Sequence, residues 1–129
     1  MSIHGGCLCG DIRVEISADP VRIGICHCLD CRKNHGALFR MFTNFPGAAV
    51  TVTGTPKVYD SGPGVHRHFC GRCGSPLLTR YDASNLVEIF VGIFDEPNTI
   101  PPPSYEIWTV RRESWLPKFP TLTYDRDRS

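Results

Sequence analysis

The sequence predicts an all-β domain, because its apolar residues alternate with polar ones at a period of two. In the segment 11–16, Ile12, Val14 and Ile16 alternate with charged residues, as in a half-buried strand. Glycine and proline interrupt the chain often, so the segments between them are short. No long stretch has the period of an amphipathic helix. We therefore expect one small domain of short, mostly antiparallel strands.

The same alternation assigns eight or nine strands in order along the chain. They cover residues 11–16, 21–25, 37–42, 50–53, 57–60, 65–70, 76–81, 86–94 and 105–110. The segment 86–94 is the most apolar and is expected at the centre of a sheet. The polar segment 32–36 predicts a single helical turn that ends at Gly36. Residues 44–47, with the sequence Asn-Phe-Pro-Gly, are expected to form a loop.

Length and composition describe one domain without unusual charge. The chain has 129 residues, of which 41% are hydrophobic and 21% charged, and its formal net charge is +1. This near-neutral balance argues against nucleic acid or a membrane surface as a partner. No apolar run approaches the roughly 20 residues of a membrane span, and no signal peptide is visible, so we expect a cytoplasmic protein. The domain is expected over residues 1–120, followed by a flexible tail over residues 121–129.

Seven cysteines require an explanation. An odd number without an export signal argues against a disulfide framework, and their tight grouping argues against inert buried thiols. In a reducing compartment, clustered cysteines are typically metal ligands. The sequence therefore predicts metal sites at strand ends, with zinc as the expected ion.

Cys70 and Cys73, followed by Gly74, are typical of a zinc knuckle, in which the glycine permits a tight turn. Such a pair supplies two ligands and needs two more. Cys7 and Cys9 are the expected partners, and the four together would make a closed, structural zinc site. Spacing alone leaves this pairing open, because Cys7 and Cys9 can also join two members of the third cysteine group.

The third group is Cys26, Cys28 and Cys31, three cysteines within one short turn. Three thiolates are one fewer than a closed zinc site needs, so the fourth position is left for water, a substrate thiol or a local side chain. A thiol bound to zinc loses its proton more easily. We therefore expect a catalytic zinc site here, and the alternative is a structural site closed by a protein ligand.

Five residues are candidates for such a closing ligand: His27, Asp30, His35, His66 and His68. His35 is the strongest candidate, because it follows Cys31 by about one helical turn. His27 lies between two ligands and is expected to point away from the metal. His66 and His68 share a strand face with Cys70, so we expect them to pack near the four-cysteine site rather than to bind metal.

Basic residues accompany the three-cysteine turn. Arg32 and Lys33 follow it directly, and Arg40 and Arg67 lie on nearby strands. These side chains are either solvated surface charge, or they compensate an anionic zinc–thiolate group or hold a substrate carboxylate. The candidates for substrate binding are Arg32, Lys33 and His35, with Arg32 first because it directly follows the third ligand.

Three blocks of sequence resemble the glutathione-dependent formaldehyde-activating enzyme family, whose domain also occurs in centromere protein V. The blocks are residues 6–10, 26–33 and 69–77, and the segments around Trp108 and Trp115 are also similar to the family. The resemblance covers residues 4–117. It implies a β-tent fold and two zinc ions per chain, one structural at Cys7, Cys9, Cys70 and Cys73, and one catalytic at Cys26, Cys28 and Cys31.

The activity that the resemblance implies is condensation of formaldehyde with glutathione to S-hydroxymethylglutathione, formally the reverse of a carbon–sulfur lyase. We therefore expect a zinc-dependent, lyase-type enzyme acting on a thiol adduct, with a small-molecule thiol such as glutathione as its partner. The alternative is a non-enzymatic zinc module that binds a protein. Its contact candidates would be residues 44–47 and exposed aromatic side chains near Trp115.

Overall fold

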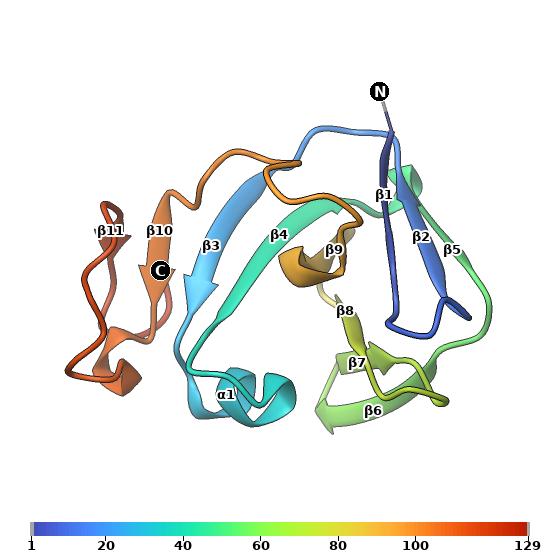
Figure 1. The fold of residues 1–129 in the computed structure, drawn as a ribbon. Helices are drawn as coiled ribbons and strands as arrows, with labels where there is room; N and C mark the ends of the chain where they lie inside the picture. Colours follow the sequence, from blue (N-terminus) through green and yellow to red (C-terminus); the bar gives the residue numbers. More distant parts are fainter. Residues whose placement is uncertain (1, 129) are drawn as a thin grey trace.

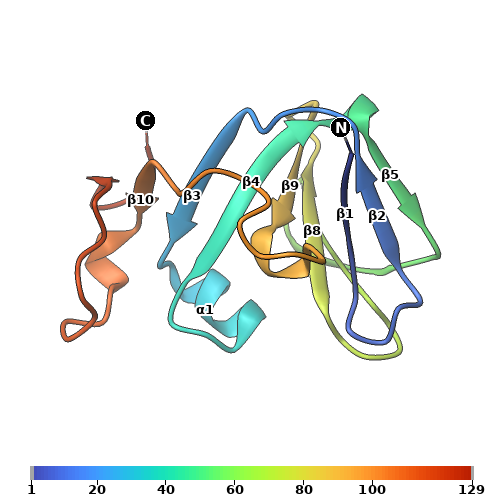
Figure 2. The same cartoon turned by 45° about the horizontal axis from the view of Figure 1, so that its top comes forward.

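Two β-sheets make up the fold, which confirms the all-β prediction (Figure 1). The structure is a computed structural model and describes residues 2–128. The small sheet has the strand order β1-β2-β5, with β1 (Ile3–Gly6), β2 (Arg13–Ile16) and β5 (Val50–Thr53). The larger sheet has the order β11-β10-β3-β4-β9-β8-β7-β6. Figure 2 shows the small sheet standing beside β8 at one side of the molecule.

The larger sheet supplies most of the residues discussed below. Its strands are β3 (Arg22–Cys26), β4 (Arg40–Pro46), β6 (Lys57–Gly62), β7 (Val65–Phe69), β8 (Pro76–Tyr81), β9 (Leu86–Phe90), β10 (Tyr105–Ile107) and β11 (Leu122–Thr123). The apolar strand β9 lies inside this sheet between β4 and β8, as expected. Strand β10 pairs in parallel with β3 and β11, whereas the other pairings in residues 2–128 are antiparallel.

The main core lies between the two sheets. Val14 and Ile16 of β2 pack in one cluster with Phe45, Val87 and Ile89 of the larger sheet. Because side chains alternate along a strand, the residues between these core positions point to the opposite face of the larger sheet. The cleft described below lies on that opposite face of the larger sheet.

One short α-helix, α1 (Leu29–His35), follows β3 and lies below the ends of β3 and β4 in Figure 1. It ends at Gly36, whose left-handed backbone (φ 60°) terminates the helix as the sequence predicted. Single 3-10 turns are η1 (Gly47–Ala49), η2 (Val91–Ile93) and η3 (Thr109–Arg111). No helix within residues 2–128 has the length and apolar character needed to cross a bilayer.

Several local predictions were wrong. The strand predicted over 86–94 ends at Phe90, where η2 follows, and the one predicted over 37–42 begins only at Arg40. Residues 44–47 do not form a separate loop, because β4 continues to Pro46 and Phe45 is 0% exposed in the core. Strand β1 was missed, since its Gly-Gly end lacks apolar alternation. The strand predicted over 105–110 stops at Ile107, and Trp108 takes a left-handed backbone (φ 58°) that starts η3.

The segment after residue 120 lies against the larger sheet. Strand β11 extends the sheet beside β10, and the backbone N–H of Trp108 donates to the carbonyl of Arg126 over 3.0 Å. The flexibility expected for residues 121–129 stays a prediction.

Candidate functional site

The first cysteine group joins two turns that are far apart in the sequence. Cys7 and Cys9 lie on the turn after β1, and Cys70 and Cys73 on the turn after β7. The four sulfur atoms lie within 4.8 Å of one another. The Cys7–Cys9 and Cys9–Cys70 sulfur distances are 3.6 and 3.7 Å. A tetrahedral zinc ion with Zn–S bonds of about 2.3 Å holds its sulfurs about 3.8 Å apart, so this set fits zinc.

Backbone and side-chain donors point at these sulfurs. The N–H of Ile12 donates to Cys7 Sγ over 3.2 Å, and the N–H of Cys73 donates to Cys70 Sγ over 3.5 Å. Gly74 has φ 79°, the left-handed conformation that such a tight turn requires. Hydrogen bonds from Ser75 lower the pKa of Cys73 to about 5. Although a backbone hydrogen bond from Asp11 acts in the opposite direction, burial and the neighbouring sulfurs of Cys7, Cys70 and Cys73 raise the pKa of Cys9 to about 12. The local donors therefore favour the thiolate at Cys73, and a cation is needed for the whole group to ionise.

The second group is built at the junction of β3 and α1. Cys26 is the last residue of β3, Cys28 caps the start of α1, and Cys31 lies in the first helical turn. Cys28 Sγ accepts a hydrogen bond from the N–H of Cys31 over 3.3 Å. The helix thus begins inside the motif and gathers the three sulfurs within 4.8 Å of one another. The partition of the cysteines into four and three is the one that the sequence predicted.

The second group has the donor set of a metal site with three protein ligands. Contacts with Cys26 and Cys28, together with burial, raise the pKa of Cys31. Three thiolates this close together repel one another, so their joint ionisation requires a cation. Within residues 2–128, no histidine, aspartate or glutamate joins these three sulfurs as a fourth ligand.

His35 lies away from the position of a closing ligand. Its ring packs edge-on against Phe90, with centroids 4.4 Å apart, and its Nε2 atom is buried. Burial, with smaller effects of Arg40 and Arg67, lowers the pKa of His35 to about 4. The side chain faces a hollow that does not contain the three cysteines. The structure therefore does not support closure of the site by His35.

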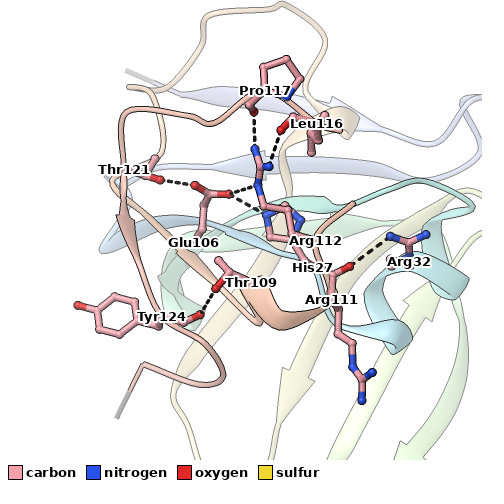
Figure 3. Close-up of polar contacts among 10 residues, drawn as sticks. All are labelled: His27, Arg32, Glu106, Thr109, Arg111, Arg112, Leu116, Pro117, Thr121 and Tyr124. Atoms are coloured by element: carbon pink, nitrogen blue, oxygen red, sulfur yellow. Dashed lines mark hydrogen bonds and ion pairs between the residues drawn. The ribbon is translucent and has the colours of Figure 1, made fainter. Parts of the chain in front are cut away.

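The other two substrate-binding candidates also face away from the cysteines. Arg32 forms an ion pair with Glu113 at 2.7 Å. It also donates to the carbonyl of Arg111 over 3.4 Å, as Figure 3 shows. Lys33 is exposed on α1. Neither residue lines the cleft described below, so their binding role stays a prediction without support from this geometry.

His27 points away from the metal group, as expected, into a buried polar network (Figure 3). Its Nε2 atom lies 2.7 Å from Oε1 of Glu106, and both side chains are almost fully buried. Glu106 also accepts a hydrogen bond from Thr121 and lies 3.6 Å from Nε of Arg112. Although burial raises its pKa, the hydrogen bonds from Thr121 and His27 hold the pKa of Glu106 below its ordinary value.

This network links the metal-binding turn to the C-terminal part of the chain. Glu106 belongs to β10, and Thr121 immediately precedes β11. Arg112 donates from its guanidinium to the carbonyls of Leu116 and Pro117. The hydrogen bond between His27 and Glu106 thus ties the turn at Cys26–Cys28 to a strand about eighty residues later in the chain.

A cleft of about 720 Å³ opens beside the three cysteines. Its walls come from the face of the larger sheet opposite the core and from the end of the chain. The lining residues are Arg22, Cys26, Cys28, Cys31, Arg40, Phe42, Asn44, Arg67, Tyr81, Ser84, Leu86, Glu88, Tyr105, Ile107, Trp108, Asp127 and Arg128. Strand alternation explains the set, because β4 contributes every second residue from Arg40 to Asn44.

Arg40 brings a positive charge to the cysteine end of the cleft. It is 6% exposed, and its Nη2 atom lies 2.6 Å from Oε1 of Glu88. Its guanidinium carbon lies 5.3 and 5.0 Å from the ring centroids of Phe42 and Phe90. Burial opposes its charge, but Glu88 and the cysteine sulfurs favour it and raise the pKa of Arg40 above its ordinary value. Arg40 therefore offsets part of the negative charge of the thiolates.

Comparison with known proteins identifies the family. Residues 2–111 match the model of the glutathione-dependent formaldehyde-activating enzyme family. The chain belongs to this family. A crystal structure of a Rhodobacter sphaeroides protein, a structural genomics target, is similar with a TM-score of 0.62 and 19% identity over 75% of this chain and 92% of that chain. That likeness concerns the fold. The comparison with curated proteins gave no match.

In this member of the formaldehyde-activating family, several cleft residues escaped sequence reasoning. No sequence motif marks Arg22, Tyr105 or Arg128. The pairing of β10 with β3 brings Tyr105 to the strand of Arg22, and the segment after β11 brings Arg128 to the same cleft. Glu106 and Arg112 likewise have no local signal. The one available hint was the charged Glu106 within an otherwise apolar strand, since a charge in a buried strand requires a partner.

Proposed function

We propose that the protein is a zinc-dependent enzyme of the carbon–sulfur lyase type that makes or breaks a thiol–aldehyde adduct, as an S-(hydroxymethyl)glutathione synthase does. One observation carries the proposal. The group of four cysteines is a complete tetrahedral set, whereas the group of three has no fourth ligand within residues 2–128 and opens onto a cleft.

Cys26, Cys28 and Cys31 would hold the catalytic zinc, and Cys7, Cys9, Cys70 and Cys73 the structural one. Zinc on three thiolates supplies Lewis-acid stabilisation of a substrate thiolate at neutral pH. The protein side chains would enclose the substrate and balance its charge. The sheet face and the end of the chain enclose the thiol, and Arg40 beside Cys26 reduces the repulsion that a further thiolate would meet.

The proposed reaction is R–SH + CH₂O ⇌ R–S–CH₂OH. In the forward direction the sulfur forms a bond to the carbonyl carbon, and the thiol proton ends on the former carbonyl oxygen. No atom changes its oxidation state through an external oxidant or reductant, so no redox partner is required. The cleft contributes by binding both reactants in one enclosed volume, which raises their effective concentration.

The test is adduct formation by the zinc-loaded protein, followed by exchange NMR of formaldehyde and glutathione above the spontaneous rate. The matched variant is Cys28→Ser, because serine keeps the helix-capping hydrogen bond that Cys28 makes but removes a thiolate ligand. We expect the variant to keep its fold and one zinc ion and to lose the acceleration. Equal rates in the variant and the wild type would contradict the proposal.

The alternative is a non-enzymatic binding module, whose three-cysteine group is either closed by His35 or carries no exchangeable ligand. His35 packs against Phe90, which argues against the first form, and the second stays a prediction. The alternative also used residues 44–47 as a contact surface, and Phe45 lies in the core. The exposed Trp115 alone favours a docking role, and no partner chemistry follows from it.

A further inference from the structure

The cleft has two chemically different ends, joined by an aromatic floor. Strand β3 runs from Arg22 to Cys26, and the side chains of both residues lie on the cleft face. Four residues of extended chain separate their Cα atoms by about 13 Å. Gly24 lies midway between them on the same face.

The absence of a side chain at Gly24 makes the floor possible. A Cβ atom there would lie 2.8 Å from Cζ of Phe42 and 2.8 Å from Cζ of Tyr105. These two rings therefore lie over the strand, edge to face with centroids 6.0 Å apart. They form a packed apolar base between the cysteine end and the Arg22 end of the cleft, with Phe42 3% and Tyr105 4% exposed.

Two arginines meet at the end away from the cysteines. The guanidinium carbon of Arg128 lies 4.7 Å from the ring centroid of Tyr105. Tyr105 lies opposite Gly24 in the pairing of β10 with β3, two residues from Arg22, and all three of Arg22, Tyr105 and Arg128 line the cleft. Within residues 2–128, neither arginine forms an ion pair.

Arg128 is held there by the segment that follows β11. Thr109 Oγ1 donates to the carbonyl of Tyr124 over 3.1 Å, and Trp108 Nε1 donates to Oδ1 of Asp127 over 2.9 Å. The guanidinium of Arg126 lies over the ring of Trp108. This segment lies beyond residues 2–111, the part of the chain that matches the family. It therefore adds a cleft wall that the family match does not account for.

We infer that Arg22 and Arg128 form a carboxylate-binding subsite at the end of the cleft opposite the cysteines, and that residues 122–128 are a specificity element. Two guanidiniums without an acidic partner, beside a tyrosine hydroxyl, match the geometry and charge of a carboxylate. This subsite rests on the proposed function for the orientation of the ligand, whose sulfur would lie at the cysteine end.

The distance between the two ends selects ligand length. A small thiol such as cysteine carries its carboxylate within one residue of its sulfur, about 3.5 Å of chain, and cannot reach both ends. A thiol whose carboxylate lies two or three residue lengths away, about 7–10 Å, can bridge them with the reach of the arginine side chains. The subsite therefore favours peptide-sized thiols with a terminal carboxylate.

The test is calorimetric binding of S-methylglutathione to the zinc-loaded protein, since this analogue keeps both carboxylates and has no thiol to ionise. We expect Arg22→Gln and Arg128→Gln each to weaken binding about ten-fold, the usual effect of losing a hydrogen bond to a charged group. The matched control is Lys118→Gln, an exposed cation outside the cleft lining, and it should bind as the wild type does.

A second arm needs no variant. The diethyl ester of S-methylglutathione should bind the unmodified protein at least ten-fold more weakly than the free acid, by the same loss of charged hydrogen bonds. Equal binding of acid and ester, or equal binding by Arg22→Gln, Arg128→Gln and the wild type, would overturn the subsite.

Turnover separates this inference from the proposed function. With cysteamine, which has no carboxylate, the arginine variants should react with formaldehyde at the wild-type rate. If no thiol is turned over by the wild type but the variants still bind S-methylglutathione more weakly, the proposed function fails and the subsite stands. If turnover occurs and the variants bind normally, the subsite fails and the proposed function stands.

Discussion

Arg40 lies directly opposite Cys26 in the antiparallel pairing of β3 with β4. The register therefore places a buried cation beside the first ligand of the three-cysteine group. Glu88, on the neighbouring strand β9, binds the other side of the guanidinium at 2.6 Å. A chain of charges thus runs from the cysteine sulfurs through Arg40 to Glu88, and it would offset the negative charge of three thiolates beside a buried strand.

Removal of one member of this chain should destabilise the fold. In Arg40→Met, Glu88 is left buried without its cation, and we expect a loss of about 3 kcal/mol in the free energy of unfolding. The double variant Arg40→Met/Glu88→Met should recover most of that loss. Urea denaturation of the zinc-loaded proteins measures the free energy of unfolding of the single and the double variant. A double variant no more stable than the single one would show that the ion pair is not the cause.

The floor of the cleft depends on Gly24. In Gly24→Ala, the added methyl group would meet Phe42 and Tyr105 at 2.8 Å, so the rings must move. We expect a loss of about 1–3 kcal/mol of stability, as in other overpacked sites, together with weaker binding of S-methylglutathione. Gly92→Ala is the matched control, because a Cβ atom there has no neighbour within 4 Å among the described residues. Equal effects of the two variants would disprove the role of the floor.

The two metal groups should lose their ions in sequence. The group of four ties the turn after β1 to a turn 61 residues later, so its zinc should be removed only as the domain unfolds. The group of three supplies one protein ligand fewer and lines the cleft, so it should release its ion first. Titration with a chelator, followed by zinc analysis and circular dichroism, should show loss of one ion with the fold intact. Loss of both ions in a single step with unfolding would contradict this order.

His66, which the sequence predicted near the four-cysteine group, contacts two aspartates and offers a pH prediction. Its ring nitrogens lie 2.7 Å from Asp60 and 2.8 Å from Asp82, and these hydrogen bonds raise the pKa of His66 above its ordinary value. Arg80 lies opposite it on β8. A raised pKa in the folded state stabilises below about pH 6.5, the unfolded value, and this contribution disappears as the pH rises through the folded pKa.

An NMR titration of the imidazole checks this directly. We expect the pKa of His66 to fall in the double variant Asp60→Asn/Asp82→Asn, while the change in stability stays small because the group is exposed. An unchanged pKa in the double variant would show that the two carboxylates do not hold the proton.

The three-cysteine group could be predicted from the sequence because its members are local, whereas the joining of two cysteine pairs 61 residues apart was an expectation that spacing alone left open. Cys26, Cys28 and Cys31 lie within one turn, and the pairs Cys7–Cys9 and Cys70–Cys73 carry their own spacing and glycines. The helix end at Gly36 was equally local. Strand alternation likewise gave the all-β class.

The cleft could not be predicted, because long-range pairing assembles it. Arg22 and Tyr105 meet because β10 pairs with β3, and no local pattern announces a parallel pairing across some eighty residues. Strand β1 was missed for a related reason. Gly5 is a glycine because a Cβ atom there would lie 2.4 Å from the carbonyl oxygen of Ile93, a contact invisible in the sequence.

The central claim is that a substrate thiol binds at the open position of the group formed by Cys26, Cys28 and Cys31. Cadmium-113 NMR of the cadmium-substituted protein tests it most directly, since each metal group gives its own resonance. We predict two resonances, of which one is missing in Cys28→Ser, and only that one should move when glutathione is added. If neither resonance moves with glutathione, or if the one retained in Cys28→Ser moves instead, the claim is wrong.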